Sequence, residues 1–111
     1  NLIKNAKNSI ILIDNYIDET VLTMLSKRMQ NCKAIIYTSK IEKHLQLDIE
    51  KHNSQYPVIA VNVFKKAHDR FLILDNKEVY HIGASIKDLG KKWFAFTKLE
   101  IDALDILNKL K

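Results

Sequence analysis

Cysteine, proline and glycine are scarce in this sequence, which has one, one and two of them among 111 residues. The single cysteine, Cys32, excludes an internal disulfide, and no Cys/His spacing matches a structural zinc site. Both observations favour a reducing, cytoplasmic environment. Because glycine and proline are so few, the turns must be built mainly from Asn, Asp, Ser and Lys.

Long hydrophobic runs are also missing. The longest uninterrupted apolar runs have only a few residues, such as IILI at residues 10–13, which excludes a membrane-spanning helix. Apolar residues make up 47% and charged residues 28% of the chain, which excludes a disordered, collagen-like or coiled-coil protein. The length fits a single domain, residues 1–111. No signal peptide is visible, and Asn1 opens a stretch that resembles a helix already under way, so we expect a domain excised from a longer protein.

Positive charge exceeds negative charge, and the formal net charge is +5 with the histidines neutral. The excess is uneven, because residues 65–98 carry eight Lys/Arg and four Asp/Glu. A positive field suits a polyanionic partner such as nucleic acid. Many soluble domains with this charge bind no polyanion, so the charge alone leaves both interpretations open.

The spacing of apolar residues predicts helices and strands in alternation. Helices are expected near residues 1–8, 18–29, 41–53 and 99–110, and strands at residues 9–14, 33–38, 57–64, 70–75 and 78–83. Asp18 is the expected N-cap of the second helix. A two-residue turn at Asn76-Lys77 makes the last two strands a hairpin. This order predicts an α/β sandwich with a mixed sheet flanked by helices, whose first strands are parallel.

The segment HDRFLILD, residues 68–75, could carry chemistry. In an extended strand His68 and Arg70 project from the same face, because side chains alternate with period two. An imidazole and a guanidinium side by side are suited to meet one phosphate. Asp75 marks the far end of the strand. The competing interpretation is an ordinary solvated strand edge.

The same segment resembles the H-x-K-x-x-x-x-D signature of the phospholipase D superfamily, which includes bacterial endonucleases. The segment KNAKNSIILIDNYIDETVLTML resembles the helix–strand–helix opening of those domains. The resemblance covers nearly the whole chain, but only one copy of the signature is present. It implies a phospholipase D-like fold and a possible metal-independent phosphodiesterase or nuclease without a cofactor. Because that mechanism uses two histidines, it also implies a homodimer.

The resemblance implies a role for each residue of the signature. His68 would attack phosphorus or protonate the leaving oxygen. Arg70 would hold the nonbridging oxygens, where the family has a lysine, and Asp75 would orient a histidine. Gly83-Ala84-Ser85 stands where the family has a Gly-Ser-x-Asn loop, and its asparagine is absent here. Ser85 and Lys87 are the phosphate-binding candidates of that loop.

A second resemblance is to the C-terminal region of prophage-type DNA-binding proteins of the KilA-N-like, RhuM-related class. It is carried by LIDNYIDETVL, HDRFLILD and YHIGASIKDLGKKWFAF. It implies a partner, DNA, and a missing N-terminal portion that reads it. The cations Lys91 and Lys92 beside Trp93 are candidate nucleic-acid contacts, because such surfaces interleave cations with aromatics. The alternative for this run is a core anchor with two solvated lysines.

Four further residues have structural and functional interpretations. His81 could reach the site or be a partly buried strand residue, whereas His44 and His52 are expected at the surface of a polar helix. Asp14 ends the first strand at the edge where α/β domains bind ligands, although a capping or turn role is equally compatible. Taken together, the sequence predicts a phosphodiester-binding domain, with DNA as the ligand. The alternative is a catalytically inactive dimerisation or partner-docking domain.

Overall fold

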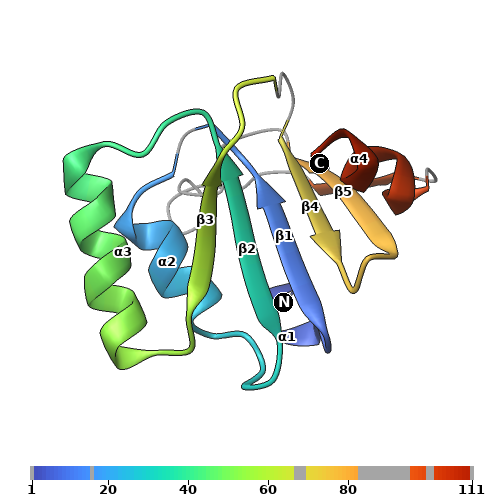
Figure 1. The fold of residues 1–111 in the computed structure, drawn as a ribbon. Coiled ribbons are helices and arrows are strands. Elements are labelled where there is room, and N and C mark those ends of the chain that lie inside the picture. Colours follow the sequence, from blue (N-terminus) through green and yellow to red (C-terminus); the bar gives the residue numbers. More distant parts are fainter. Residues whose placement is uncertain (1, 16, 67–69, 83–95, 100–101, 111) are drawn as a thin grey trace.

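The computed structural model describes residues 2–15, 17–66, 70–82, 96–99 and 102–110, and the structural statements below concern these residues. The helices are α1 (Leu2–Asn5), α2 (Glu19–Leu25), α3 (Lys43–Gln55) and α4 (Ala103–Lys109). The strands are β1 (Ser9–Ile13), β2 (Lys33–Thr38), β3 (Ile59–Val63), β4 (Phe71–Leu74), β5 (Glu78–Ile82) and β6 (Phe96–Leu99). Figure 1 shows their arrangement.

The strands form one mixed sheet in the order β3-β2-β1-β4-β5-β6. The pairs β1–β2 and β2–β3 are parallel, whereas β1–β4, β4–β5 and β5–β6 are antiparallel. The predicted α/β fold, with a mixed sheet whose first strands are parallel, is therefore confirmed. The narrower phospholipase D-like architecture stays a prediction.

Helices cover both faces of the sheet. On one face, α2 and α3 pack with Val21, Leu25 and Ile49 on the inward side chains of β1 and β2. On the other face, α4 packs through Ala103 on a second cluster that includes Ile73. The central strand β1 is buried on both faces, as its continuous apolar run predicts.

The second helix begins where the sequence predicts. The carboxylate of Asp18 accepts a hydrogen bond from the backbone N–H of Thr20 at 3.0 Å, which caps the first turn of α2. The helix ends earlier than expected, at Leu25, and Met29 lies outside it with an exposed side chain. The apolar spacing overestimates the length of this helix, because Met29 stands four residues after Leu25, at helical spacing, although the helix has already ended.

The β4–β5 hairpin is confirmed, but its turn begins one residue earlier than the sequence predicts. The residues with positive φ are Asp75 (56°) and Asn76 (57°), and the N–H of Lys77 bonds to the carbonyl of Leu74 at 3.0 Å. Two left-handed residues form the turn type whose twist matches the flanking strands, and Asn and Asp tolerate that conformation well. The turn is therefore Asp75-Asn76 and not Asn76-Lys77.

The C-terminal part differs from the expected single helix over residues 99–110. Leu99 belongs to β6, which pairs with β5, and α4 begins only at Ala103 after the N-cap Asp102. The spacing of apolar residues predicts Leu99 in the helix, because Leu99 packs on the same core cluster as the apolar side chains of the helix although it belongs to a strand. No helix in the described part of the chain is long and apolar enough to cross a membrane.

Candidate functional site

The carboxyl edge of the parallel strands collects the polar side chains that can bind a ligand. Strands β1, β2 and β3 run in the same direction and end at this edge, at residues 13, 38 and 63. Strand β4 runs the opposite way beside β1, so its first residues lie at the same edge. Arg70 directly precedes β4 and Asp14 directly follows β1, which brings two residues distant in the sequence together.

Asp14 and Arg70 are ion-paired at this edge. The Nε atom of Arg70 lies 4.0 Å from Oδ1 of Asp14. The Asp14 side chain is 0% exposed and the Arg70 side chain is 33% exposed. A buried carboxylate needs a partner of opposite charge, because transfer from water strongly disfavours an isolated ion. Asp14 therefore holds Arg70 in place, while part of the guanidinium faces solvent and can donate hydrogen bonds to an anion.

The strand register fixes the face on which Arg70 lies. Leu72 and Leu74 of β4 belong to the core cluster beneath α2 and α3, whereas Phe71 and Ile73 belong to the cluster beneath α4. With alternation of period two, Arg70 lies on the α2/α3 face. His81 pairs with Phe71 in the ladder and makes an edge-to-face contact with its ring, at 5.6 Å between centroids. His81 is thus a partly buried strand residue on the opposite face from Arg70.

Two further cations extend the positive charge at the same edge. Lys65 and Lys66 follow β3 closely, and both are exposed. The backbone N–H of Phe64 bonds to the carbonyl of Thr38 at 2.7 Å, which fixes the chain just before these lysines to the end of β2. Neither lysine is among the predicted site residues, although two lysines directly after the strand predicted over residues 57–64 are a usable signal.

Asp75 lies at the other edge of the sheet from Arg70. The four residues of β4 separate them, which corresponds to roughly 16 Å in an extended strand. The Asp75 carboxylate accepts hydrogen bonds from the backbone N–H groups of Lys7, Asn8 and Ser9, the shortest being 2.6 Å from Asn8. These bonds, first that from Asn8, lower the pKa of Asp75 below its ordinary value.

Within the chain Asp75 thus lies apart from Arg70, and the role that the family resemblance implies for Asp75 stays a prediction. Its carboxylate joins the hairpin turn to the start of β1, which is a structural role. The sequence could not indicate this, because the partners are backbone groups 66 to 68 residues away.

The other candidates lie outside the described residues. They are His68 of the signature, Ser85 and Lys87 of the loop, and Lys91, Lys92 and Trp93 of the aromatic run. Their assignments stay predictions. Of the predicted site residues, the structure thus describes Arg70 and Asp75 and keeps them apart.

The two histidines of α3 differ from each other. His44 is exposed, as expected, and its Nε2 lies 3.4 Å from Oδ2 of Asp48. His52 is only 7% exposed, which corrects the expectation of a surface position. Its ring stacks on Tyr56, and burial, followed by the positive charge of Arg28, lowers the pKa of His52. The described residues contain no group of three or more His, Cys, Asp or Glu side chains that could hold a metal ion.

Comparison of the sequence with models of known protein families and with curated proteins finds no match.

Proposed function

We propose that this domain binds phosphodiester groups, with DNA as the ligand, at the carboxyl edge of the sheet around Arg70. The observation that carries the proposal is the partly exposed side chain of Arg70, which is ion-paired with the fully buried carboxylate of Asp14. A guanidinium fixed in this way loses little side-chain freedom when it meets a phosphate, and its planar fork suits the nonbridging oxygens.

The surrounding charge supports a polyanionic ligand. Asp14 offsets the charge of Arg70, and Lys65 and Lys66 add two exposed positive charges just after β3. The chain as a whole carries a net charge of +5. A polyanion gains affinity from several such cations through the release of its counterions. The proposal concerns binding, because the hydrolysis implied by the family resemblance also needs His68, which lies outside the described residues.

Binding to short single-stranded and duplex oligonucleotides, measured by fluorescence anisotropy over a range of salt concentrations, tests the proposal. The affinity should fall as salt rises. Changing both Lys65 and Lys66 to Gln should lower the slope of log K against log salt by about 1.8 for duplex DNA, if each lysine contacts one phosphate. The matched control is Lys33→Gln, because Lys33 is exposed at the start of β2, the opposite edge of the sheet.

The contribution of Arg70 is tested with variants that separate an effect on DNA binding from an effect on folding. Arg70→Gln alone removes the cation that is paired with the buried carboxylate of Asp14, so the combined variant Asp14→Asn/Arg70→Gln is measured beside Asp14→Asn. We expect the combined variant to bind DNA about tenfold more weakly than Asp14→Asn, because a charge-assisted hydrogen bond is worth about 1.5–3 kcal/mol. Equal affinities in all these variants, or salt-independent binding, would refute the proposal and favour a docking domain.

A further inference from the structure

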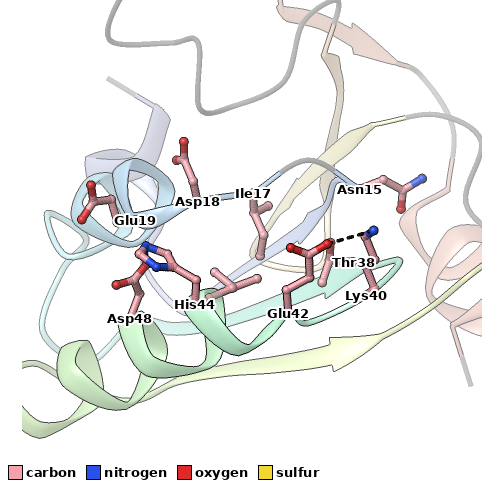
Figure 2. A pocket seen from close by; sticks show the side chains of 10 residues that line it. Asn15, Ile17, Asp18, Glu19, Thr38, Lys40, Glu42, His44 and Asp48 are labelled. Carbon is pink, nitrogen blue, oxygen red and sulfur yellow. Dashed lines mark ion pairs between the residues drawn. The ribbon is translucent and has the colours of Figure 1, made fainter.

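A hollow of about 270 Å³ opens on the α2/α3 side of the carboxyl edge. It lies between the ends of β1 and β2 and the first turns of α2 and α3 (Figure 2). Arg70 and Asp14 do not line it. It is therefore a feature separate from the proposed phosphate site, and its ligand has to be argued from its own lining.

The charge of the hollow is opposite to that of the protein. Four carboxylates line it, and they belong to Asp18, Glu19, Glu42 and Asp48. The only ammonium in the lining is that of Lys40, which lies 2.9 Å from Glu42. With His44 neutral, the lining carries three more negative than positive charges. The hollow therefore favours a cation, although the protein as a whole is basic.

The carboxylates are divided between two sides of the hollow, with apolar side chains between them. Figure 2 shows Asp18, Glu19 and Asp48 on one side and Glu42 on the other. Ile17 lies between these two sides in Figure 2, and the lining also includes Leu45, which is buried. Because Lys40 already pairs with Glu42, the excess negative charge lies on the side of Asp18, Glu19 and Asp48, and a ligand that fits this order has an ammonium group at that end of an aliphatic chain and an N–H donor at the other.

Thr38 gives an independent indication of a polar ligand. It lines the hollow from the end of β2 and is 1% exposed. Its Oγ1 has no hydrogen-bond partner in the described part of the chain. A buried hydroxyl without a partner is unfavourable, because it loses its bonds to water and gains none in return. An amine N–H entering the hollow beside Thr38 would supply the missing partner.

We propose that this hollow binds an aliphatic diamine or polyamine. One ammonium group lies among Asp18, Glu19 and Asp48, the methylene chain packs on Ile17 and Leu45, and the second amine donates to Thr38 beside Glu42. A bare divalent metal fits less well, because the described residues offer no group of three metal-ligating side chains. A monoamine would leave one side of the hollow without a partner.

Titration of ¹⁵N-labelled protein by NMR tests the proposal. The probes are 1,4-diaminobutane and spermidine, with n-butylamine and 4-aminobutyrate as controls of equal chain length. Because Glu19 and Glu42 are exposed and Asp18 and Asp48 are only partly buried, we expect weak binding at low salt, with a dissociation constant on the order of 1 mM. The diamine should shift the amide signals of residues 17–19 and 38–48 and should bind more tightly than either control.

Three variants locate the bound amine. Asp18→Asn keeps the helix cap, because Asn caps as well as Asp, and it should weaken binding about two- to fivefold through the lost charge. Glu19→Gln should also weaken binding about two- to fivefold through the lost charge. Thr38→Val should weaken binding about two- to tenfold without lowering stability to urea, because the hydroxyl has no partner to lose. The control is Glu50→Gln, since Glu50 is exposed on α3 outside the hollow.

The proposal is overturned if the diamine causes no saturable shift, or if n-butylamine binds as tightly as the diamine. It is also overturned if binding is the same in Asp18→Asn, Glu19→Gln and Thr38→Val. DNA binding is measured on the same variants and should be unchanged, so failure of this proposal is distinguishable from failure of the proposed function.

Discussion

The bond between the β4–β5 turn and the start of β1 allows a sharp prediction about Asp75. Its carboxylate accepts hydrogen bonds from three consecutive backbone N–H groups, those of Lys7, Asn8 and Ser9. Its backbone is left-handed, with φ at 56°. Asp75→Ala removes the acceptor and also places a poorly suited residue at a positive φ.

The expected loss in the free energy of unfolding is the sum of these two contributions. Bonds to a charged acceptor contribute about 1.5–3 kcal/mol each when protected, but these partners are mostly exposed, so we take about 2 kcal/mol for the set. The left-handed backbone adds about 1 kcal/mol for Ala. Asp75→Ala should therefore lower the free energy of unfolding by about 3 kcal/mol. Asp75→Gly should lose only about 2 kcal/mol, because glycine adopts positive φ freely.

Asp75→Asn is the matched variant, because Asn tolerates the same φ and keeps one acceptor oxygen. It should lose about 1 kcal/mol at neutral pH. The pKa of Asp75 is lowered on folding from its ordinary value of 3.8, so the carboxylate stabilises the fold above that pH. This contribution is lost as pH falls through the lowered pKa, and the difference between the wild type and Asp75→Asn should shrink there.

Urea unfolding followed by far-UV circular dichroism between neutral pH and pH 3 measures all four proteins. Because each kcal/mol corresponds to about 4 °C in Tm for a domain of this size, thermal unfolding gives a second readout. If Asp75→Ala and Asp75→Asn were as stable as the wild type, the structural role of Asp75 would be refuted. If their stability were unchanged while hydrolysis of a phosphodiester fell, the role implied by the family resemblance would be favoured instead.

Three further predictions concern burial and assembly. Arg28 is 7% exposed, and its guanidinium donates to the carbonyls of Leu25, Cys32 and Pro57 at 2.8–2.9 Å, so Arg28→Met should lower stability to urea by about 3 kcal/mol. Because the pKa of His52 is lowered on folding, the wild type has its full stability above pH 6.5 and loses stability as pH drops through the folded pKa. In His52→Leu, the free energy of unfolding in urea should therefore change less between pH 7 and pH 5 than it does in the wild type. The expected homodimer is checked by sedimentation, and a monomer at about 100 μM would contradict it.

Much of the fold was predictable because it depends on local patterns. The apolar runs of β1 and β2 identify these two strands by their hydrophobicity alone. Asp18 caps α2 through a hydrogen bond to Thr20, only two residues away. The hairpin was found from its turn residues, but its register was not, because both Asp75-Asn76 and Asn76-Lys77 are plausible turns in the sequence.

The site depended on tertiary structure. Sequence alone placed Arg70 at the start of one strand and Asp14 at the end of another, but only the antiparallel pairing of β1 with β4 joins them as an ion pair. The same pairing carries Asp75 to the opposite edge, where it meets backbone N–H groups that have no sequence signature. His52 was expected in water because its neighbours in the sequence are polar, whereas it is buried in the fold. The sequence by itself therefore determined which segments become strands and helices, since that depends on neighbouring residues. The partners of each charged side chain were decided only by the packing of segments distant along the chain, because desolvation and ion pairing depend on distances in space.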